Sequence, residues 1–392
     1  MRGLRGGLSR RSAGRLLELR HLAGQLLRLK AAKGMARAAT AVGARAPVTL
    51  RQVSLKITNL CHLRCPMCAQ WGTAGYNVGV DRSVLTAGEM RPEQYRQLID
   101  RVEPVRPLYY VWGGEPFLYH GLMEVATHIK RRGSALAVVT SGHRLAEHAA
   151  RIVEDRWDIL MLSIDGDRDL HDRIRGRRGT FDQLVAGHEA VLAERERQRS
   201  PYPFVMTLST VCELNSPQYD RVFEALEEIG GVDLAVHYLS WFTTEEVGRR
   251  HTEVLEGRLG CTPTAWRGFV AAAGGVDVAG LQEGLRRAAR RRWSFPFVLV
   301  PDIRLEEVPS YYDQPAETFG HGRCVAPWVV AEVMPNGDVA PCRDHPDFVC
   351  GNIKEQGLDE VFRGERFEAF RSALRSERLF PACTRCCGLM GM

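Results

Sequence analysis

Three closely spaced cysteines constrain this chain more than any other feature. Cys61, Cys65 and Cys68 have the spacing Cys-x3-Cys-x2-Cys and follow the apolar run 53–57, which predicts the strand that leads into their loop. Three thiolates on one tight loop can hold three irons of a 4Fe-4S cluster and leave the fourth iron open to another ligand. A structural zinc site is the alternative. It needs a fourth protein ligand, and His62 lies too close to Cys61 to complete a regular tetrahedron easily.

The composition is that of a globular protein from a reducing compartment. The chain has 392 residues, 45% of them hydrophobic, which is enough for one large core or two smaller ones. Its eleven cysteines are an odd number and fall in groups, unlike the regular framework of a secreted disulfide protein. No apolar run reaches the roughly 18 residues that a membrane span needs. We therefore expect a cytoplasmic protein.

Positive charge is concentrated at the start of the chain. Residues 1–45 hold eleven Lys or Arg and one acidic residue, a net charge of +10, so the remainder carries 6 minus 10, or −4. A mildly acidic body argues against a nucleic-acid substrate. Leucines at helical spacing between residues 15 and 33 predict a basic amphipathic helix within an N-terminal extension, residues 1–48. This helix either makes a peripheral contact with an anionic membrane surface or, as the alternative, docks on its own barrel or belongs to a partly disordered leader.

Apolar strand patterns alternate with helical patterns over residues 49–240. Such alternation is typical of parallel βα units and predicts an α/β fold with its chemistry at the C-terminal ends of the strands. The expected strands are 53–57, 108–112, 136–140, 159–164, 204–211 and 233–239, and the expected helices are 92–102, 122–132, 145–155, 181–197 and 218–229.

The second expected strand ends in Gly113, Gly114 and Glu115, followed by Pro116. Two glycines let backbone approach a ligand closely, and the carboxylate can accept a hydrogen bond from an ammonium group. This turn, about 45 residues after the cysteine loop, resembles the radical S-adenosylmethionine (radical SAM) superfamily. The resemblance implies a partial (β/α)6 TIM-type barrel and S-adenosylmethionine chelated to the open iron. It also implies cofactor contacts from the glycines, Glu115 and Met67.

Later strand ends carry further candidates. The resemblance to relatives with extra clusters assigns cofactor contacts to Ser163 and Arg175, since an Arg fork suits a carboxylate, and to Asn215. Surface roles without a ligand are the alternative. Asp165 is a candidate substrate contact or catalytic base at the same mouth. Residues 140–142 read Thr-Ser-Gly where many relatives have Thr-Asn-Gly, so their role stays open.

Residues 241–322 show no motif and are expected to form an irregular helical insertion that meets the substrate. The basic run 286–292 faces water or contacts a phosphate-bearing or lipid-linked substrate. Aromatic residues near 295–312 form either a substrate wall or core.

The C-terminal part, residues 323–392, has its own cysteines. Cys324 and Cys342 flank a predicted β-hairpin whose turn is the Asn-Gly pair at 336–337, and Cys383 and Cys386 follow a helical pattern. Two pairs of soft ligands suit an auxiliary 4Fe-4S cluster, with zinc as the alternative.

The spacing of these cysteines resembles the SPASM/twitch extension of radical SAM enzymes, in its shorter form with one auxiliary cluster, on a small α+β domain. Cys350 and Cys387 are spare, and Cys387 could replace Cys386 as the last ligand.

The family resemblance implies reductive cleavage of S-adenosylmethionine to a 5'-deoxyadenosyl radical that removes hydrogen from a substrate carbon. The resemblance to twitch enzymes favours oxidation of a small, sugar-like or lipid-linked molecule, with a flavodoxin- or ferredoxin-type electron donor.

An epimerase is an alternative, with Cys212 as catalytic hydrogen donor, although a lone cysteine is more often simply a small buried residue. Peptide maturation is a second alternative, weakened because no leader-binding domain is recognisable. A non-enzymatic metal scaffold would leave residues 113–116 unexplained.

Overall fold

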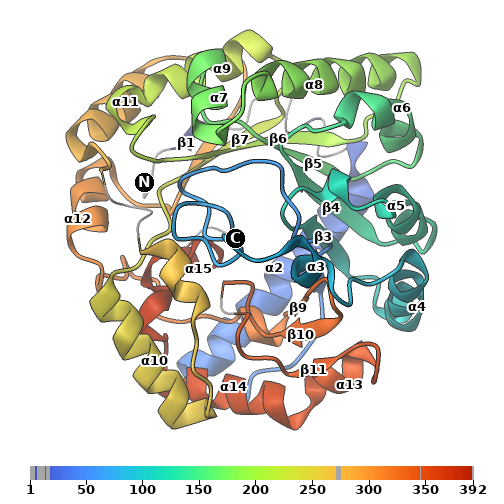
Figure 1. The fold of residues 1–392 in the computed structure, drawn as a ribbon, viewed down its shortest axis with the longest axis vertical. Helices are drawn as coiled ribbons and strands as arrows, with labels where there is room; N and C mark the ends of the chain where they lie inside the picture. The colour runs from blue at the N-terminus through green and yellow to red at the C-terminus, as the bar shows by residue number, and fades with distance from the viewer. Residues whose placement is uncertain (1–4, 7–13, 15–17, 271–274, 345, 391–392) are drawn as a thin grey trace.

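The computed structural model describes residues 5–6, 14, 18–270, 275–344 and 346–390. In this part of the chain eleven strands form one sheet, in the order β1-β8-β7-β6-β5-β4-β3-β2-β9-β10-β11. Figure 1 shows the sheet curving around a central space that the loop after β2 crosses. Neighbouring strands from β2 to β8 run parallel: β2 (Gln52–Lys56), β3 (Leu108–Trp112), β4 (Ala135–Thr140), β5 (Ile159–Ser163), β6 (Phe204–Thr210), β7 (Leu234–Tyr238) and β8 (Phe297–Val300).

Helices cover the outside of this sheet, so the predicted partial TIM-type barrel is confirmed (Figure 1). The helix α7 illustrates how local sequence sets the bounds. The side chain of its N-cap, Asp167, accepts a hydrogen bond from the backbone N–H of Leu170, and Gly176 ends the helix in the left-handed region at φ +68°. The covering helices are α4 (Pro92–Val102), α5 (Leu122–Arg131), α6 (Leu145–Glu154), α7 (Arg168–Arg175), α8 (Thr180–Arg197), α9 (Asp220–Ile229) and α11 (Val278–Arg290).

The segment 241–322 is more regular than expected. It contains α10 (Glu245–Leu259), α11 and α12 (Val308–Asp313), and it also contains β8, which pairs in parallel with β7. The prediction of an irregular helical insertion did not include this strand at residues 297–300. This strand is only four residues long and follows a polybasic helix, so its pattern alone could not distinguish it from a piece of core.

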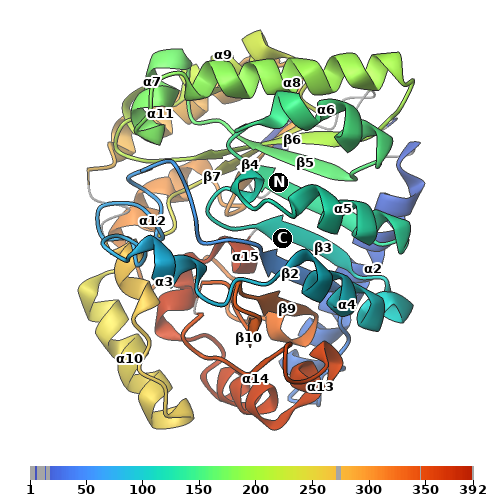
Figure 2. The same cartoon turned by 45° about the vertical axis from the view of Figure 1, so that its right-hand side comes forward.

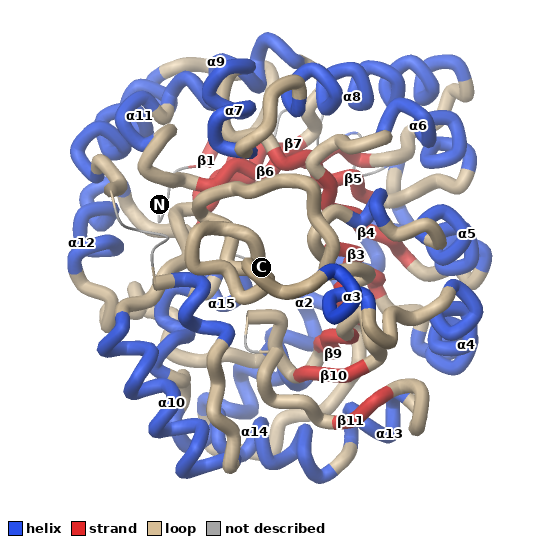
Figure 3. Tube along the Cα trace, viewed as in Figure 1, coloured by secondary structure: helices blue, strands red, loops and turns tan. Residues whose placement is uncertain are grey.

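The C-terminal domain joins the barrel sheet directly. Its first strand, β9 (Val330–Val333), runs parallel to β2, with Ser54 opposite Glu332, and β10 (Asp338–Ala340) and β11 (Gly351–Asn352) continue antiparallel. The predicted hairpin turn at 336–337 joins β9 to β10. The domain also contains α13 (Leu358–Arg363), α14 (Glu365–Glu377) and α15 (Cys387–Met390). Strands β9, β10 and β11 thus extend the row of strands beyond β3 and β2 (Figure 3).

The N-terminal helix docks on the protein itself. The helix α2 (Arg20–Ala41) buries Leu22, Leu29, Ala32 and Ala36 against β4 and the turn at 326–328. Figure 2 shows it at the far end of the strands from the cysteine loop. Of the alternatives for this helix, the contact with its own barrel is the one seen. None of the described helices is long and apolar enough to cross a membrane.

Two short elements complete the described structure. The strand β1 (Arg5–Gly6) pairs antiparallel with β8. The helix α3 (Arg82–Thr86) lies between the cysteine loop and α4 in the chain. Asp81 caps its N-terminus, because its carboxylate accepts a hydrogen bond from the N–H of Ser83.

Candidate functional site

The three N-terminal cysteines lie on one tight loop beside a cavity of about 300 Å³. The backbone N–H of Cys68 donates to the carbonyl oxygen of Cys65 (3.0 Å), and the N–H of Gly72 donates to the carbonyl oxygen of Cys68 (2.7 Å). Burial raises the pKa of the Cys61 thiol to about 12 and that of Cys65 to about 11. In the metal-free protein both thiols are therefore protonated at neutral pH, and metal binding must displace their protons.

The two glycines at the end of β3 are required by the cysteine loop itself. The N–H of Gly114 donates to the carbonyl oxygen of Thr58 (2.9 Å), and the N–H of Glu115 donates to that of Leu60 (2.8 Å). A Cβ atom on Gly113 would lie 2.5 Å from the carbonyl oxygen of Thr58, and one on Gly114 would collide with that of Leu60. Glycine therefore lets the β3 turn approach the loop that carries the thiols.

Glu115 is buried and held by four hydrogen bonds. Its Oε1 accepts from the Thr140 hydroxyl (2.7 Å) and from the Phe117 N–H (3.2 Å). Its Oε2 accepts from the N–H (2.8 Å) and the hydroxyl (2.6 Å) of Ser141. The Thr-Ser-Gly segment, whose role the sequence left open, thus fixes this carboxylate at the cavity wall. Gly142 completes the turn by donating its N–H to the Thr140 hydroxyl oxygen (3.0 Å).

Arg175 joins the cysteine loop to the end of β5. Its Nη2 pairs with Oδ2 of Asp165 at 2.5 Å, and its Nη1 lies 3.6 Å from the sulfur of Cys65. Asp165 also accepts a hydrogen bond from the N–H of Thr210 (2.8 Å). Arg175 and Ser163 line the cavity, whereas Asp165 lies behind Arg175 and does not.

Asn215 and Cys212 lie outside the cavity wall. Asn215 is buried and its amide is used locally: Oδ1 accepts from the Cys212 N–H (2.8 Å), and Nδ2 donates to the carbonyl oxygens of Thr210 (2.9 Å) and Asp165 (3.2 Å). Cys212 is 2% exposed and packs in a small apolar cluster with Leu170, next to Met67. The predicted set therefore separates into residues that line the cavity (Met67, Gly113, Gly114, Glu115, Ser163, Arg175 and the three cysteines) and residues that do not (Asn215, Cys212, Asp165).

A polar group inside the barrel was not predicted. Lys56, on β2, is 4% exposed, and its Nζ lies 3.3 Å from the Tyr76 hydroxyl and 5.8 Å from the centre of the Trp112 ring. Burial lowers the pKa of Lys56 to about 8, an effect that the neighbouring Cys68 opposes. The signal in the sequence was the alternation of polar and apolar residues along β2, which places Lys56 on the same face as Ser54. Because burying a charged group costs desolvation free energy, we regard Lys56 as a candidate functional residue.

The same polar group continues toward the C-terminal domain. The Trp112 indole donates to the Ser54 hydroxyl (2.9 Å), and Ser54 lies opposite Glu332 in the sheet. Glu332 is 3% exposed and lies 3.4 Å from Nε of Arg343, which stacks over Tyr110 at 4.6 Å. Tyr110 and Trp112 line the cavity, so these residues connect the first cysteine site to the hairpin next to the second.

The C-terminal cysteines also gather at one place. Burial, together with the nearby Asp344, Cys383 and Cys324, raises the pKa of the Cys342 thiol well above its usual value. The Cys386 thiol donates to Oδ2 of Asp344 at 3.3 Å. Lys33 of α2 lies close enough to Cys324 to oppose the rise of its pKa by burial. The four predicted ligands thus come together from a hairpin and from the end of the chain.

The two spare cysteines differ. Cys350 is buried near Arg366 and Arg371, in the core of the domain. The side chain of Cys387 lies outside the described residues. Among the described side chains, no group of three or more His, Cys, Asp or Glu converges on a single metal-ion position. The three thiols of the first loop, which line one cavity with Glu115, nevertheless fit a 4Fe-4S cluster with one open iron. Each thiolate of such a cluster binds a different iron, so the thiols need not converge on one point.

The chain resembles proteins of known family. Residues 55–195 match the radical SAM superfamily, and residues 324–387 match the SPASM iron–sulfur cluster-binding domain. A tungsten-containing aldehyde ferredoxin oxidoreductase cofactor-modifying protein from Pyrococcus furiosus is 21% identical over 363 residues, covering 86% of this chain and 87% of that protein. An AdoMet-dependent heme synthase from Oleidesulfovibrio alaskensis is 23% identical over 341 residues, covering 86% and 80%.

A solved structure supports the same fold. SuiB from Streptococcus suis, bound to S-adenosylmethionine, matches with a TM-score of 0.57 at 13% identity, covering 83% of this chain and 68% of that one. The two matched domains carry 4Fe-4S clusters and S-adenosylmethionine as their cofactors. The chain therefore belongs to the radical SAM superfamily and carries a C-terminal SPASM domain.

Proposed function

We propose that this radical SAM enzyme oxidises a small organic molecule held between its two cysteine sites. Cys61, Cys65 and Cys68 would hold the first cluster. The ligands of the auxiliary cluster would be Cys324, Cys342, Cys383 and Cys386. When bound, the reduced first cluster supplies the electron that splits S-adenosylmethionine into methionine and a 5'-deoxyadenosyl radical, which removes hydrogen from a substrate carbon.

The observation that carries this proposal is the pairing of β9 with β2. It puts the hairpin of the auxiliary cysteines beside the strand that leads into the first cysteine loop. A substrate radical that becomes a closed-shell product must lose one more electron. The auxiliary cysteines would hold an acceptor for that electron next to the same cavity.

Residues of the cavity wall have separate roles in this proposal. Glu115, fixed by Thr140 and Ser141, would accept a hydrogen bond from the ammonium group of S-adenosylmethionine, and Arg175 and Ser163 would contact its polar groups. Trp112 and Tyr110 provide flat apolar surface against which a substrate can be held. Buried Lys56 gives the interior a cationic group, whereas half-buried Arg343 is already paired with Glu332. A small molecule with an acidic group could therefore pair with Lys56.

The names of two curated relatives favour a small-molecule substrate, whereas another, a PqqA peptide cyclase from Streptomyces rochei that covers 74% of this chain, is named for a peptide, so peptide maturation remains the second candidate. The two relatives above, which cover 86% of this chain, are a cofactor-modifying protein and a heme synthase. Oxidation of a sugar-like molecule remains one form of the proposal, and a cofactor-type acid is another.

Iron analysis of two sets of variants tests the arrangement. We expect about eight irons per chain in the wild type after anaerobic reconstitution, and about four in either a Cys61→Ala/Cys65→Ala/Cys68→Ala or a Cys342→Ala/Cys383→Ala variant. Only the second variant should still form 5'-deoxyadenosine. If both variants retained about four irons and neither formed 5'-deoxyadenosine, the separate roles of the two clusters would be contradicted.

The epimerase alternative has its own test. Cys212 is buried away from the cavity wall, so Cys212→Ala should keep product formation within about threefold, as expected for a small packing change. Product formation that stops while 5'-deoxyadenosine continues would instead support a hydrogen-donor role for this thiol.

A further inference from the structure

Arginines gather on the outer surface of the first cysteine loop. Arg64 lies within the loop, and Arg173, Arg177 and Arg178 lie at and beyond the end of α7; all four side chains are exposed. The two segments touch, because the N–H of Arg64 donates to the carbonyl oxygen of Arg175 at 3.2 Å. We call these four residues the arginine patch.

Other arginines of this region are neutralised by carboxylates. Arg221 pairs with Asp167 at 2.5 Å, and Arg168 pairs with Asp182. No ion pair joins the arginine patch to any carboxylate within the part of the chain that the structure describes. The nearest acidic residues of α7 do not change this, since Asp172 accepts hydrogen bonds from the N–H groups of Gly179 and Phe181. Asp169 alone adds an exposed negative charge there.

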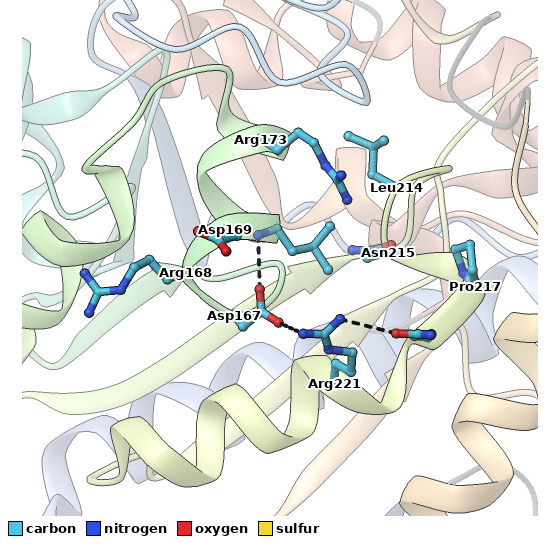
Figure 4. Close-up of a pocket in the computed structure, with 10 residues that line it drawn as sticks. Asp167, Arg168, Asp169, Arg173, Leu214, Asn215, Pro217 and Arg221 are labelled. Carbon is cyan, nitrogen blue, oxygen red and sulfur yellow. Dashed lines mark hydrogen bonds and ion pairs between the residues drawn. The ribbon is translucent and has the colours of Figure 1, made fainter.

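A surface hollow adjoins the patch. Its volume is about 670 Å³, and Arg173, Leu170 and Leu214 line it. Figure 4 shows Arg173 and Leu214 on the same side of the hollow and the Asp167–Arg221 ion pair on the other. Leu170 packs through its apolar cluster against Met67, which lies between Cys65 and Cys68 in the chain. The wall of the hollow and the first cysteine loop thus share one small apolar cluster.

We propose that the arginine patch is the docking surface for a small acidic electron carrier of the flavodoxin or ferredoxin class. The argument is charge complementarity. The chain beyond residue 45 has a net charge of −4, so an acidic carrier is not attracted to the body in general. A local group of unpaired cations next to the site that must be reduced would steer the carrier there. The carrier would be oxidised by one electron, and a cluster held by Cys61, Cys65 and Cys68 would be reduced by it. The need for this electron rests on the proposed function.

Charge reversal tests the docking surface on the reconstituted full-length enzyme. The patch variant is Arg173→Glu/Arg177→Glu/Arg178→Glu; Arg64 is left in place because it donates to the carbonyl oxygens of Cys61 and Leu63 and so shapes the loop. The matched control is Arg131→Glu/Arg249→Glu/Arg250→Glu. These residues are also exposed, and they lie on α5 and α10, away from α7 (Figure 1). Both triple variants change the net charge by the same amount.

The readout is the rate at which reduced flavodoxin bleaches the iron–sulfur absorbance, compared with reduction by dithionite. We expect the wild-type rate with flavodoxin to fall as salt is added, and the patch variant to be at least about tenfold slower at low salt with little salt dependence. The control variant should stay within about threefold of wild type, and dithionite should reduce all three proteins alike. The proposal is overturned by equal slowing in both variants, by an unchanged patch variant, or by a wild-type rate that salt does not affect.

Slow reduction of the patch variant by dithionite as well would also overturn it, since the substitutions would then act on the cluster itself. Formation of 5'-deoxyadenosine with dithionite keeps the two proposals distinguishable. If it is absent from the wild type, the proposed function fails, whatever flavodoxin does.

Discussion

At the scale of single residues, the carboxylate of Glu115 is the best-defined feature of the site. It is 1% exposed, and the hydroxyl groups of Thr140 and Ser141 supply two of its four hydrogen bonds. A buried carboxylate that loses such donors either moves or takes up a proton. Its ability to bind an ammonium group depends on both position and charge.

The double variant Thr140→Val/Ser141→Ala should therefore bind S-adenosylmethionine more weakly. Hydrogen bonds to a charged group contribute about 1.5–3 kcal/mol each, so we expect the dissociation constant to rise by a factor of about ten or more. Equilibrium binding to the reconstituted enzyme measures this. Thr127→Val is the control, because that hydroxyl donates to Met123 and Asp155 on the outer helices. Unchanged affinity in the double variant would contradict the role assigned to Glu115.

A second residue-level prediction concerns pH. His237 is buried, stacks on Phe223 at 4.0 Å, and has a pKa lowered by burial from 6.5 to about 3. Between these values the unfolded chain binds a proton that the folded chain does not, so stability falls as the pH drops below 6.5. Unfolding in urea should show that the free energy of unfolding of His237→Phe rises relative to wild type by about 1.6 kcal/mol in total from pH 6.5 to 5, with a slope that approaches about 1.4 kcal/mol per pH unit at the lower end. A constant difference between the two proteins would show that His237 does not titrate this way.

The sequence predicted the site residues that stand in short motifs and missed those that stand alone. The cysteine triplet, the Gly-Gly-Glu turn and Arg175 stand in short motifs, and the structure brings them to one cavity wall. Lys56 and Glu332 are the single charged residues of their strands, and the position of Glu332 opposite Ser54 depends on the register between β2 and β9. Asn215 is the reverse case. Its motif position was clear, but its amide bonds backbone groups of its own loop, at Cys212 and Thr210, and of the loop at Asp165.

At the scale of elements, the six strands and the longer helices of residues 49–240 were predicted, whereas the short helices α3 and α7 were not. Pairings between distant parts of the chain could not be predicted either. The predicted bounds of β3 and α4 equal those observed, since both have clear hydrophobic periods and α4 has a proline at its start. The pairing of β9 with β2 joins residues 278 positions apart, Ser54 and Glu332, and no local pattern contains such a contact. The strand β8 was also missed, because its four residues do not show by themselves that they pair with β7.

The helix α2 offers a matched test of docking within one element. Leu22 is fully buried, so Leu22→Ala should lower the free energy of unfolding by about 2–5 kcal/mol. Leu27 on the same helix is 67% exposed, and Leu27→Ala should change it by less than about 0.5 kcal/mol. Chemical denaturation under anaerobic conditions measures both. Equal effects of the two substitutions would contradict the observed orientation of α2.

At the scale of the whole molecule, one sheet places two cysteine sites on either side of a polar interior. The arginine patch lies outside the first site, and the hairpin of the second continues the barrel through β9. Electrons would thus enter at the loop between β2 and α3 and, in the proposed oxidation, return from the substrate to the auxiliary cysteines. This arrangement explains why a C-terminal domain of modest size is joined to the barrel sheet.

The most direct test of the account is formation of 5'-deoxyadenosine by the anaerobically reconstituted, dithionite-reduced protein. The wild type should form it, Cys212→Ala should form it at a similar rate, and Cys65→Ala should form none, because the first cluster would lose one of its three thiolates. A Cys65→Ala protein that cleaves S-adenosylmethionine as fast as wild type would contradict the account.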